Sequence, residues 1–418
     1  MNLEITNLDN GITVATDTMP GIRSITLGIW IKVGSRDEEP DQHGLAHFME
    51  HMVFKGTPHY SAVQISAVFD ALGAELNAFT SKEYTCLHAR FVDEKLDQVV
   101  PIMAEMLTDS LFAPEDIENE REVVVEEIAR SEDTPDDHVF ELFSHALMPT
   151  HPLGRPVLGD RKLVEGYGHD DCERFHALHY GTQNLVVAAA GHVDHRKLVS
   201  LIEESFSRLA MGDKTERVPA SESAPMSFSC QTKDIEQAHF VYGFPWMDAS
   251  DDRRFAGALA SAILGGSMSS RLFQEVREKN GLAYAVFSQG ILYSDAGMFC
   301  IYCGTRPDNL KQALSIVQRE VRRLAEEPPT SEEVERQCGA ICGSLLLGME
   351  STSTRMARLG RAICLGLPLR DAEELVERYR QLGPADVQRV AQDFMTAAPT
   401  LAVVSPFEEG SLAGILEA

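Results

Sequence analysis

An internal repeat constrains the fold of this chain more than any other feature of its sequence. Ile117, at the start of a helical segment rich in proline and glutamate, matches Val334 at an offset of 217. The strand-like segment 185–187 matches 401–403 at an offset of 216. A nearly constant offset maintained over about 70 residues predicts that the chain arose by duplication and contains two similar halves.

The predicted boundary between the halves is a polar linker at 212–225, which contains two prolines. At 418 residues the chain is too long to fold around one hydrophobic core, so separate compact units are expected. We therefore predict an N-terminal half at 1–215 and a homologous C-terminal half at 226–418.

Strand and helix patterns alternate in both halves. Runs rich in β-branched residues predict strands, and longer amphipathic runs predict helices. The expected strands and hairpins lie at 11–15, 24–31, 76–80, 84–91, 185–190, 238–244 and 281–303, and the expected helices at 61–72, 94–110, 114–131, 251–265, 309–326 and 330–348. Residues 133–160 contain four prolines and are expected to be rich in loops. The predicted fold class is α+β, two duplicated halves, each an antiparallel sheet with helices packed on one face.

The charge balance limits the classes of partner. The chain has 37 basic and 64 acidic residues and a net charge of −27. Such a negative surface disfavours nucleic acid and anionic membranes, and it favours cationic partners such as basic peptides if part of the charge lines a cavity. A charge spread over the surface for solubility explains the composition equally well.

The ends and cysteines of the chain indicate a soluble, cytoplasmic protein. The first residues resemble neither a signal peptide nor a transit peptide, and no apolar stretch is long enough to cross a bilayer. The eight cysteines have no disulfide-framework spacing, which suits a reducing compartment. The pair Cys300 and Cys303 lies in an apolar run and is interpreted as two core cysteines, not as half of a metal site.

The segment from His47 to His51 reads His-Phe-Met-Glu-His. In a helix His47, Glu50 and His51 leave one face, because i+3 and i+4 neighbours are adjacent. Two imidazoles one turn apart can bind a zinc ion, and the carboxylate between them can handle the proton of a water on that ion. The alternative is a surface helix that carries two histidines and a glutamate by chance.

A catalytic zinc site needs a third protein ligand. The most suitable source is the acidic helical segment 114–131, where Glu120 and Glu127 share one stripe at i and i+7. One of these carboxylates can be a ligand while the other orients a ligand imidazole. Spacing alone does not separate Glu126 from Glu127, and most glutamates of so acidic a helix are expected to face solvent.

The segment Gly44 to Thr57 resembles the active-site segment of the pitrilysin-type (inverzincin) zinc metallopeptidases, and is closest to the β subunit of mitochondrial processing peptidase and its bacterial homologues. The resemblance extends over essentially the whole chain and includes 77–80 and 151–156. Met49 replaces the usual leucine, a substitution with little expected effect.

The resemblance implies a site in the N-terminal half. In this family the third ligand follows the last histidine by 76 residues, which selects Glu127, and Glu120 takes the place of the carboxylate that orients a ligand. The metal ligands would be His47, His51 and Glu127, with one Zn²⁺ per chain, and Glu50 would be the general base. Substrate would bind in extended form along the strand formed by Asn77, Ala78, Phe79 and Thr80.

The resemblance also assigns a role to the C-terminal half, which lacks the His-x-x-Glu-His motif and has Ser344 opposite Glu127. Arg277 and Tyr284 match a family pair that donates hydrogen bonds to the developing oxyanion. On their residue types alone, they would be a surface arginine and a core tyrosine. Because the family's longer members supply this pair from the half facing the zinc, a homodimer, or a heterodimer with a homologous subunit, is expected to complete the site in trans.

The function implied by the resemblance is that of a zinc metalloendopeptidase, a hydrolase that cleaves peptides or basic presequence-like segments inside a dimer chamber. Two alternatives remain open at this point. One is a non-catalytic core or scaffold subunit with the same fold, and the other is a broad oligopeptide scavenger in place of a specific processing peptidase.

Overall fold

The computed structural model describes residues 2–220, 226–412 and 415–416. It divides into two compact units, neither of which is continuous in sequence. Unit 1 comprises Met1–Ala129, Arg155–Val218 and Leu347–Leu369, and unit 2 comprises Arg130–Gly154, Pro219–Leu346 and Arg370–Ala418.

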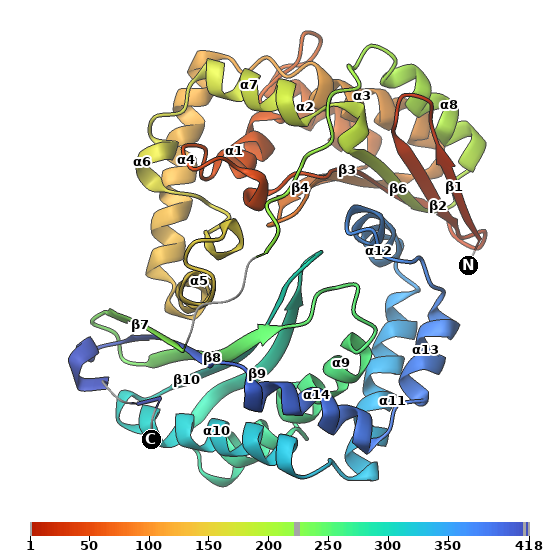
Figure 1. Cartoon of the computed structure of the whole chain (residues 1–418). Coiled ribbons are helices and arrows are strands. Elements are labelled where there is room, and N and C mark those ends of the chain that lie inside the picture. The colour runs from red at the N-terminus through yellow and green to blue at the C-terminus, as the bar shows by residue number, and fades with distance from the viewer. Residues whose placement is uncertain (1, 221–225, 413–414, 417–418) are drawn as a thin grey trace. The chain divides into compact units, whose positions relative to one another are not determined.

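The centre of unit 1 is a six-stranded sheet with the order β1-β2-β6-β3-β5-β4 (Figure 1). Its strands are β1 (Leu3–Asn7), β2 (Thr13–Thr18), β3 (Ser24–Ile31), β4 (Glu75–Thr80), β5 (Thr85–Val92) and β6 (Leu185–Gly191). Neighbouring strands are antiparallel except for β2 and β6, which are parallel. Because β4 ends the order, one of its sides has no strand partner among the described residues.

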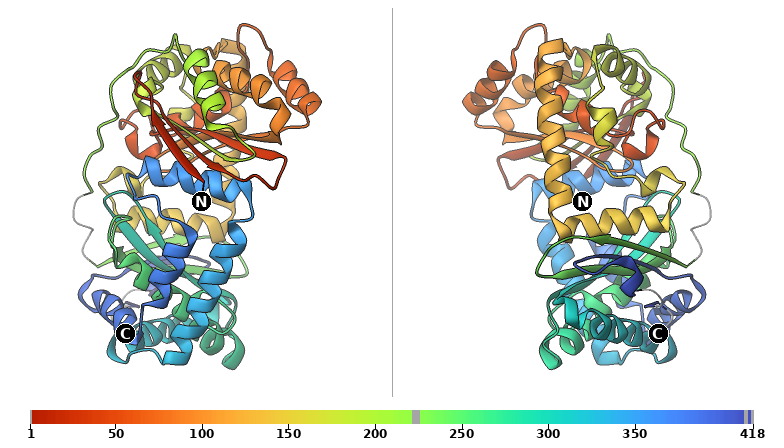
Figure 2. Two further views of the ribbon diagram at one scale, coloured as in Figure 1. Left: turned by 90° about the vertical axis from the view of Figure 1, so that its right-hand side faces the viewer. Right: turned by 90° about the vertical axis from the view of Figure 1, so that its left-hand side faces the viewer.

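Helices cover both faces of this sheet (Figure 2). The helices of unit 1 are α1 (Leu45–Met52), α2 (Ala62–Leu72), α3 (Leu96–Thr108), α4 (Pro114–Asp133, whose last turn belongs to unit 2), α6 (Arg161–Val164), α7 (His169–His179), α8 (His195–Ser205) and α12 (Thr352–Cys364). Alternate residues of β3 face opposite ways. On one face, the alternate residues Ile25, Leu27, Ile29 and Ile31 join the main core with residues of α1 and α3. On the other face, Trp30 packs against α12.

Unit 2 contains a five-stranded sheet with the order β7-β11-β8-β10-β9. Its strands are β7 (Ser227–Thr232), β8 (Ala238–Trp246), β9 (Ala283–Leu292), β10 (Gly297–Thr305) and β11 (Thr400–Ser405). Its helices are α5 (Pro135–Leu147), α9 (Arg254–Gly265), α10 (Leu310–Glu326), α11 (Ser331–Gly348), α13 (Ala372–Arg380) and α14 (Pro384–Thr396). As in unit 1, only one pair of neighbours, β7 and β11, is parallel.

The two sheets have the same connectivity, since β2-β6-β3-β5-β4 and β7-β11-β8-β10-β9 match strand for strand in order and direction. Each unit also takes one helix from the other part of the sequence. Helix α12 packs on β2, β3 and β6 in unit 1, and helix α5 packs on β7, β8 and β11 in unit 2. The division of the sequence into homologous halves at 1–215 and 226–418 stays a prediction, because the compact units follow packing and not sequence continuity.

The α+β class is confirmed, but two details of the prediction are wrong. The sheets are not purely antiparallel, because each has one parallel pair, and helices pack on both faces of each sheet and not on one, because α12 or α5 covers the second face. The loop-rich prediction for 133–160 is wrong where α5 lies. Pro135 is in the first turn of that helix, where a missing N–H costs nothing and the fixed φ favours helix.

Several smaller predictions can be compared with the structure. Residues 212–220 of the predicted linker form neither helix nor strand, and 221–225 lie outside the described residues. Cys300 and Cys303 are fully buried in β10, as predicted. In the part of the chain that the structure describes, every helix is too short or too polar to cross a membrane.

Candidate metal centre

Helix α1 is fixed at its N-terminus by the carboxylate of Glu38. Gly44, the residue before the helix, has φ of 94°, a left-handed conformation that favours glycine. The backbone N–H groups of Gly44 and Ala46 donate to the two oxygens of Glu38 at 3.0 and 2.8 Å. Burial raises the pKa of Glu38 to about 8, and these two hydrogen bonds act in the opposite direction. Glu38 therefore satisfies N–H groups that would otherwise lack an acceptor at the start of the helix.

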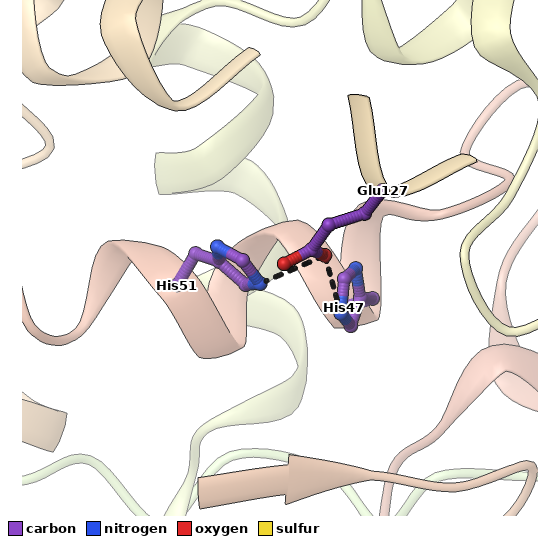
Figure 3. A group of neighbouring side chains, drawn as sticks. All are labelled: His47, His51 and Glu127. Carbon is purple, nitrogen blue, oxygen red and sulfur yellow. Dashed lines mark ion pairs between the residues drawn. The ribbon is translucent and has the colours of Figure 1, made fainter. Parts of the chain in front are cut away.

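The fixed helix presents His47 and His51 to Glu127 of α4 (Figure 3). Phe48, Met49 and Met52 face the core, so the polar residues leave the opposite side. Oε2 of Glu127 lies 3.7 Å from Nε2 of His47 and 3.5 Å from Nε2 of His51. The ligand atoms of the three residues all lie within 4.8 Å of one another.

These separations fit a shared metal ion. Ligands at 2.0–2.1 Å from a tetrahedral zinc lie about 3.3 Å from each other, close to the two distances from Glu127. The structure brings Glu127 to the histidines and leaves Glu126 exposed. The assignment of the three residues as ligands is part of the function proposed below.

The pKa values of the two imidazoles shift in opposite directions. Burial, assisted by the nearby His51, lowers the pKa of His47 to about 3, so that imidazole is neutral and offers a lone pair. Burial also lowers the pKa of His51, but the hydrogen bond to Glu120 and the charge of Glu127 outweigh this effect and raise it. A bound cation would displace that additional proton, because metal and proton compete for the same nitrogen.

Glu120 sets the orientation of the His51 ring. Nδ1 of His51 lies 2.8 Å from Oε1 of Glu120, which is 5% exposed. Lys55 forms an ion pair with the other oxygen of Glu120. Since an ionised carboxylate only accepts, we assign the proton to Nδ1, which leaves the lone pair of Nε2 directed to Glu127.

Glu50 of α1 contacts Thr80 of the edge strand β4. Burial raises the pKa of its carboxyl above the ordinary value, although hydrogen bonds from the side chain and backbone of Thr80 act in the opposite direction. Among the described residues no hydrogen bond reaches the buried Oε2 of Glu50. The carboxyl of Glu50 thus faces Thr80, and its Oε2 can accept a proton from a bound water.

The predicted substrate segment, Asn77 to Thr80, forms the second part of β4. Exposure alternates along the strand, with Asn77 and Phe79 outward and Ala78 and Thr80 half-buried. Oδ1 of Asn77 accepts the N–H of Ala78 at 2.8 Å. The contact between Thr80 and Glu50 connects this edge to the histidines of α1.

Arg277 and Tyr284 belong to unit 2. Arg277 lies in a π-helical turn, Phe273–Lys279, and Tyr284 is the second residue of β9. The Arg277 guanidinium packs 4.8 Å from the centre of the Tyr284 ring and donates to the Tyr284 carbonyl at 2.8 Å. Tyr284 is 79% exposed, so the alternative that made it a core residue is wrong. The role of the pair in catalysis stays a prediction.

Comparisons with known proteins identify the family. Residues 13–161 match the insulinase peptidase family M16, and residues 168–340 match the M16 inactive domain. The chain belongs to the M16 peptidase family. The predicted resemblance to pitrilysin-type metallopeptidases is thereby confirmed, whereas the particular closeness to the processing peptidase β subunit stays a prediction.

Proteins named zinc proteases match this chain along nearly its full length. An uncharacterized zinc protease of Streptomyces coelicolor is 40% identical over 97% of this chain and 90% of its own. A zinc protease of Bacillus subtilis is 35% identical over 95% of this chain and 97% of its own. The crystal structure of a protease from Helicobacter pylori has a TM-score of 0.91 at 22% identity, covering 97% of this chain and 99% of that one, and shows the same fold.

Two side chains of this M16 site are absent from the sequence-based prediction, Glu38, which caps α1, and Lys55, which pairs with Glu120. A third, Thr80, is predicted only to bind substrate, whereas the structure also places it against Glu50. Lys55 lies one turn after His51, a spacing that could have suggested a shared partner. No local pattern joins Glu38 to α1 or Thr80 to Glu50, because those contacts depend on how the loop and hairpin pack.

Proposed function

We propose that this chain is a zinc-dependent endopeptidase. The observation that carries the proposal is the convergence of His47, His51 and Glu127 beside the buried Glu50. The named zinc proteases among its relatives support zinc as the ion. Zinc held by these three residues would acidify a water molecule and polarise a peptide carbonyl.

Glu50 and Glu120 then determine where protons are held and transferred. Glu50 accepts a proton from the attacking water and later donates it to the leaving amine, a role suited to a carboxyl whose pKa is raised by burial. Hydrogen bonds from Thr80 counteract the effect of burial on the carboxyl of Glu50. Glu120 keeps the proton of His51 on Nδ1, so that Nε2 stays available.

The edge strand β4 is the proposed substrate-binding element. An extended peptide added beside Asn77 to Thr80 would bind through main-chain hydrogen bonds, which depend little on sequence. The net charge of −27 favours basic peptides, including presequence-like segments, by attraction at low ionic strength.

Arg277 and Tyr284 are proposed as the donors to the oxyanion, supplied by the second subunit of a homodimer or by a homologous partner that closes a chamber around the peptide. Mixing Glu50→Gln chains with Arg277→Ala chains tests this role. A mixed dimer unites an intact Glu50 with an intact Arg277, so activity is expected to recover. No recovery after subunit exchange would refute the trans arrangement.

Two other functions are possible for this fold, a non-catalytic core or scaffold subunit and a broad oligopeptide scavenger. The complete set of His47, Glu50, His51 and Glu127 disfavours the scaffold. The scavenger differs from a processing peptidase only in selectivity, which a comparison of basic, neutral and acidic peptides of equal length measures.

The decisive experiment is peptide hydrolysis by the purified protein before and after chelation. We expect turnover to stop on chelation and to return with zinc, and Glu50→Gln to bind zinc but not to hydrolyse peptide. Glu126→Gln, one residue from Glu127 but exposed, is the matched control and is expected to keep its activity. A fully active chelated protein or an active Glu50→Gln variant would overturn the proposal.

A further inference from the structure

The first part of the predicted linker is tied to unit 1 by specific polar contacts. The side chain of Asn184 donates to the carbonyl of Asp213 at 3.1 Å and accepts the N–H of Thr215 at 3.1 Å. Nη2 of Arg36 donates to the carbonyl of Val218 at 2.9 Å. We refer to residues 213–218 as the anchored segment.

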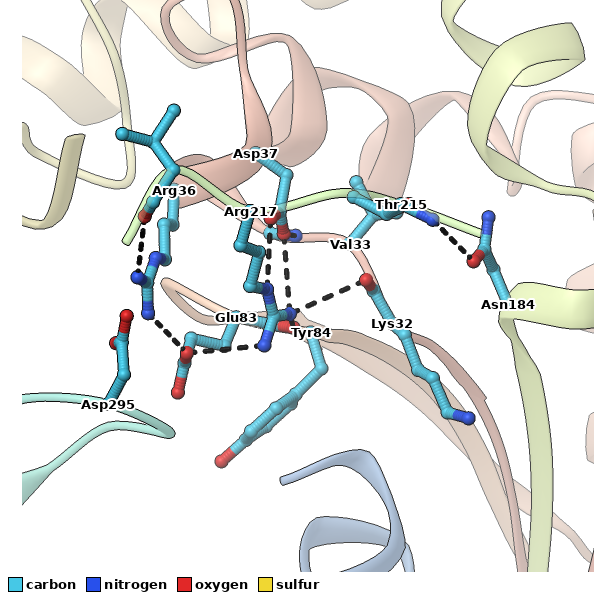
Figure 4. A network of polar contacts seen from close by, with 12 residues as sticks. Lys32, Val33, Arg36, Asp37, Glu83, Tyr84, Asn184, Thr215, Arg217 and Asp295 are labelled. Carbon is cyan, nitrogen blue, oxygen red and sulfur yellow. Dashed lines mark hydrogen bonds and ion pairs between the residues drawn. The ribbon is translucent and has the colours of Figure 1, made fainter. Parts of the chain in front are cut away.

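Arg217 is the central residue of the anchored segment (Figure 4). Its Nε donates to Oδ1 of Asp37 at 3.0 Å, and its Nη1 donates to Oε1 of Glu83 at 3.2 Å. The side chains of Asp37 and Glu83 are 0% and 2% exposed, and that of Arg217 is 18% exposed. Nη2 of Arg217 also donates to the carbonyls of Lys32 and Glu83.

A second arginine completes a charge cluster made of Arg36, Asp37, Glu83 and Arg217. Nη1 of Arg36 donates to the same Oε1 of Glu83 at 2.8 Å, and both side chains are nearly fully buried. The cluster contains two cations and two anions, which balance one another away from water. Removing one member of such a cluster leaves buried charge uncompensated, which is strongly unfavourable.

The cluster lies where two loops of unit 1 meet. Residues 34–37 pair with the turn between β4 and β5, since the N–H groups of Ser35 and Arg36 donate to the carbonyls of Ser81 and Lys82 at 3.1 and 2.8 Å. A Cβ on Gly34 would lie 2.2 Å from the Ser81 carbonyl oxygen, so the two backbones are as close as they can be. Asp37 belongs to one loop and Glu83 to the other, and Arg217 bridges them.

Each loop leads directly to one part of the candidate metal centre. Residue 38 follows Asp37, and its carboxylate caps the helix that carries His47. Three residues before Glu83, Thr80 hydrogen bonds to Glu50. The position of Thr80 and of the edge strand β4 against Glu50 therefore depends on how the two loops are held together.

We propose that Arg217 is a positioning residue of the catalytic site, through which the linker fixes the β4–β5 turn against the loop that leads into α1. The proposal rests on the proposed peptidase function for its kinetic consequence, but not for its structural one. Lysine could keep one ion pair but has no planar fork to reach Asp37 and Glu83 together. The guanidinium is therefore required, and not only its charge.

A purely stabilising role is the alternative, and the chain contains a matched control for it. Arg355 of α12 is 20% exposed and forms a 2.8 Å ion pair with the fully buried Asp17 of β2, on the face of the sheet that α12 covers. Arg355→Gln leaves a buried carboxylate without its cation, as Arg217→Gln does. The polar contacts of Arg355 are with Asp17 and Met349, away from the β4–β5 turn and the loop into α1.

The test compares Arg217→Gln, Arg217→Lys and Arg355→Gln in the full chain. Without any substrate, amide hydrogen exchange in residues 75–92 is expected to speed up at least tenfold in Arg217→Gln and to stay at the wild-type rate in Arg355→Gln. With peptide, kcat/KM is expected to fall at least tenfold in Arg217→Gln and partly in Arg217→Lys, at equal zinc content. Arg355→Gln should stay within twofold, with each protein assayed at the same interval below its Tm.

A double-mutant cycle separates positioning from general destabilisation. If Arg217 acts through the hairpin, Arg217→Gln and Thr80→Val have less than additive effects on kcat, whereas Arg355→Gln and Thr80→Val are additive. The proposal would be overturned if Arg217→Gln and Arg355→Gln showed the same rate of hairpin amide exchange and the same loss of kcat/KM. Faster exchange of the hairpin in a protein that hydrolyses no peptide would instead retain the structural role and refute the peptidase function. Should Arg217→Gln not fold, Arg217→Lys is judged by the same criteria.

Discussion

Replacement of Glu120 by glutamine tests the proposed metal centre through a residue that would not contact the ion. Glu120 is 5% exposed and is bonded to His51 and Lys55. Glutamine keeps the size of the side chain and an oxygen that can accept from Nδ1, but it removes the charge. The variant therefore weakens the hydrogen bond to His51 and removes the ion pair with Lys55 without creating a cavity.

The expected magnitude follows from that bond. A hydrogen bond to a charged group contributes about 1.5–3 kcal/mol, against about 0.5–1.5 kcal/mol for a neutral one. A loss of about 1.4 kcal/mol corresponds to a tenfold weaker zinc affinity. The ammonium group of Lys55, left without its partner, adds repulsion toward a cation. We therefore expect the zinc affinity to fall by about tenfold to a hundredfold.

The assay is competition for zinc between the protein and a chelating dye at constant pH. Glu122→Gln is the control, because Glu122 lies on the same helix, is exposed, and its replacement changes the net charge by the same amount. The control is expected to bind zinc within about twofold of wild type, since exposed charges are screened by salt. Wild-type affinity in Glu120→Gln, or an equal loss in Glu122→Gln, would refute the reasoning.

Three further predictions concern stability. Gly360→Ala is expected to lower the free energy of unfolding by about 1–3 kcal/mol, because the added Cβ would lie 2.0 Å from the Trp30 ring. The control variant Gly339→Ala places its Cβ in open space on α11 and should instead raise the Tm, because alanine favours helix more than glycine does. Burial raises the pKa of Glu333, but hydrogen bonds led by that of Arg271 outweigh it and lower the pKa to about 2 from 4.5. The contribution of Glu333 to the free energy of unfolding is therefore full above pH 4.5 and is lost as the pH falls toward 2. Denaturant titrations of wild type and Glu333→Gln should differ by up to about 3 kcal/mol above this range, and the difference should shrink as the pH falls through it. Zinc at a thousandfold excess over its Kd should raise the unfolding free energy of the apoprotein by about 4 kcal/mol, measured by calorimetry, and no shift of Tm would contradict specific binding.

The local features of the site could be predicted from the sequence, because they depend on the geometry of single elements. The spacing of His47, Glu50 and His51 places them on one helix face whatever surrounds the helix. The predicted hairpin formed by 76–80 and 84–91 corresponds to the strands β4 and β5. The segment 133–160 was misjudged because four prolines suggested loops, although Pro135 is at a helix start.

Only the tertiary structure decided which distant residues meet. Glu126 and Glu127 have the same chemistry, and the packing of α4 alone brings the second of them to the histidines. Helix α5 of the first sequence half packs in unit 2, and helix α12 of the second half packs in unit 1. The hydrophobic periodicity of these helices does not reveal this exchange, because any amphipathic helix can cover any apolar sheet face of matching shape. The sequence by itself determined the chemistry and the local faces of this protein, since backbone geometry repeats over a few residues. The folded chain decided the partners, such as Arg217 with Asp37 and Glu83, because such contacts arise only when loops far apart in sequence pack together.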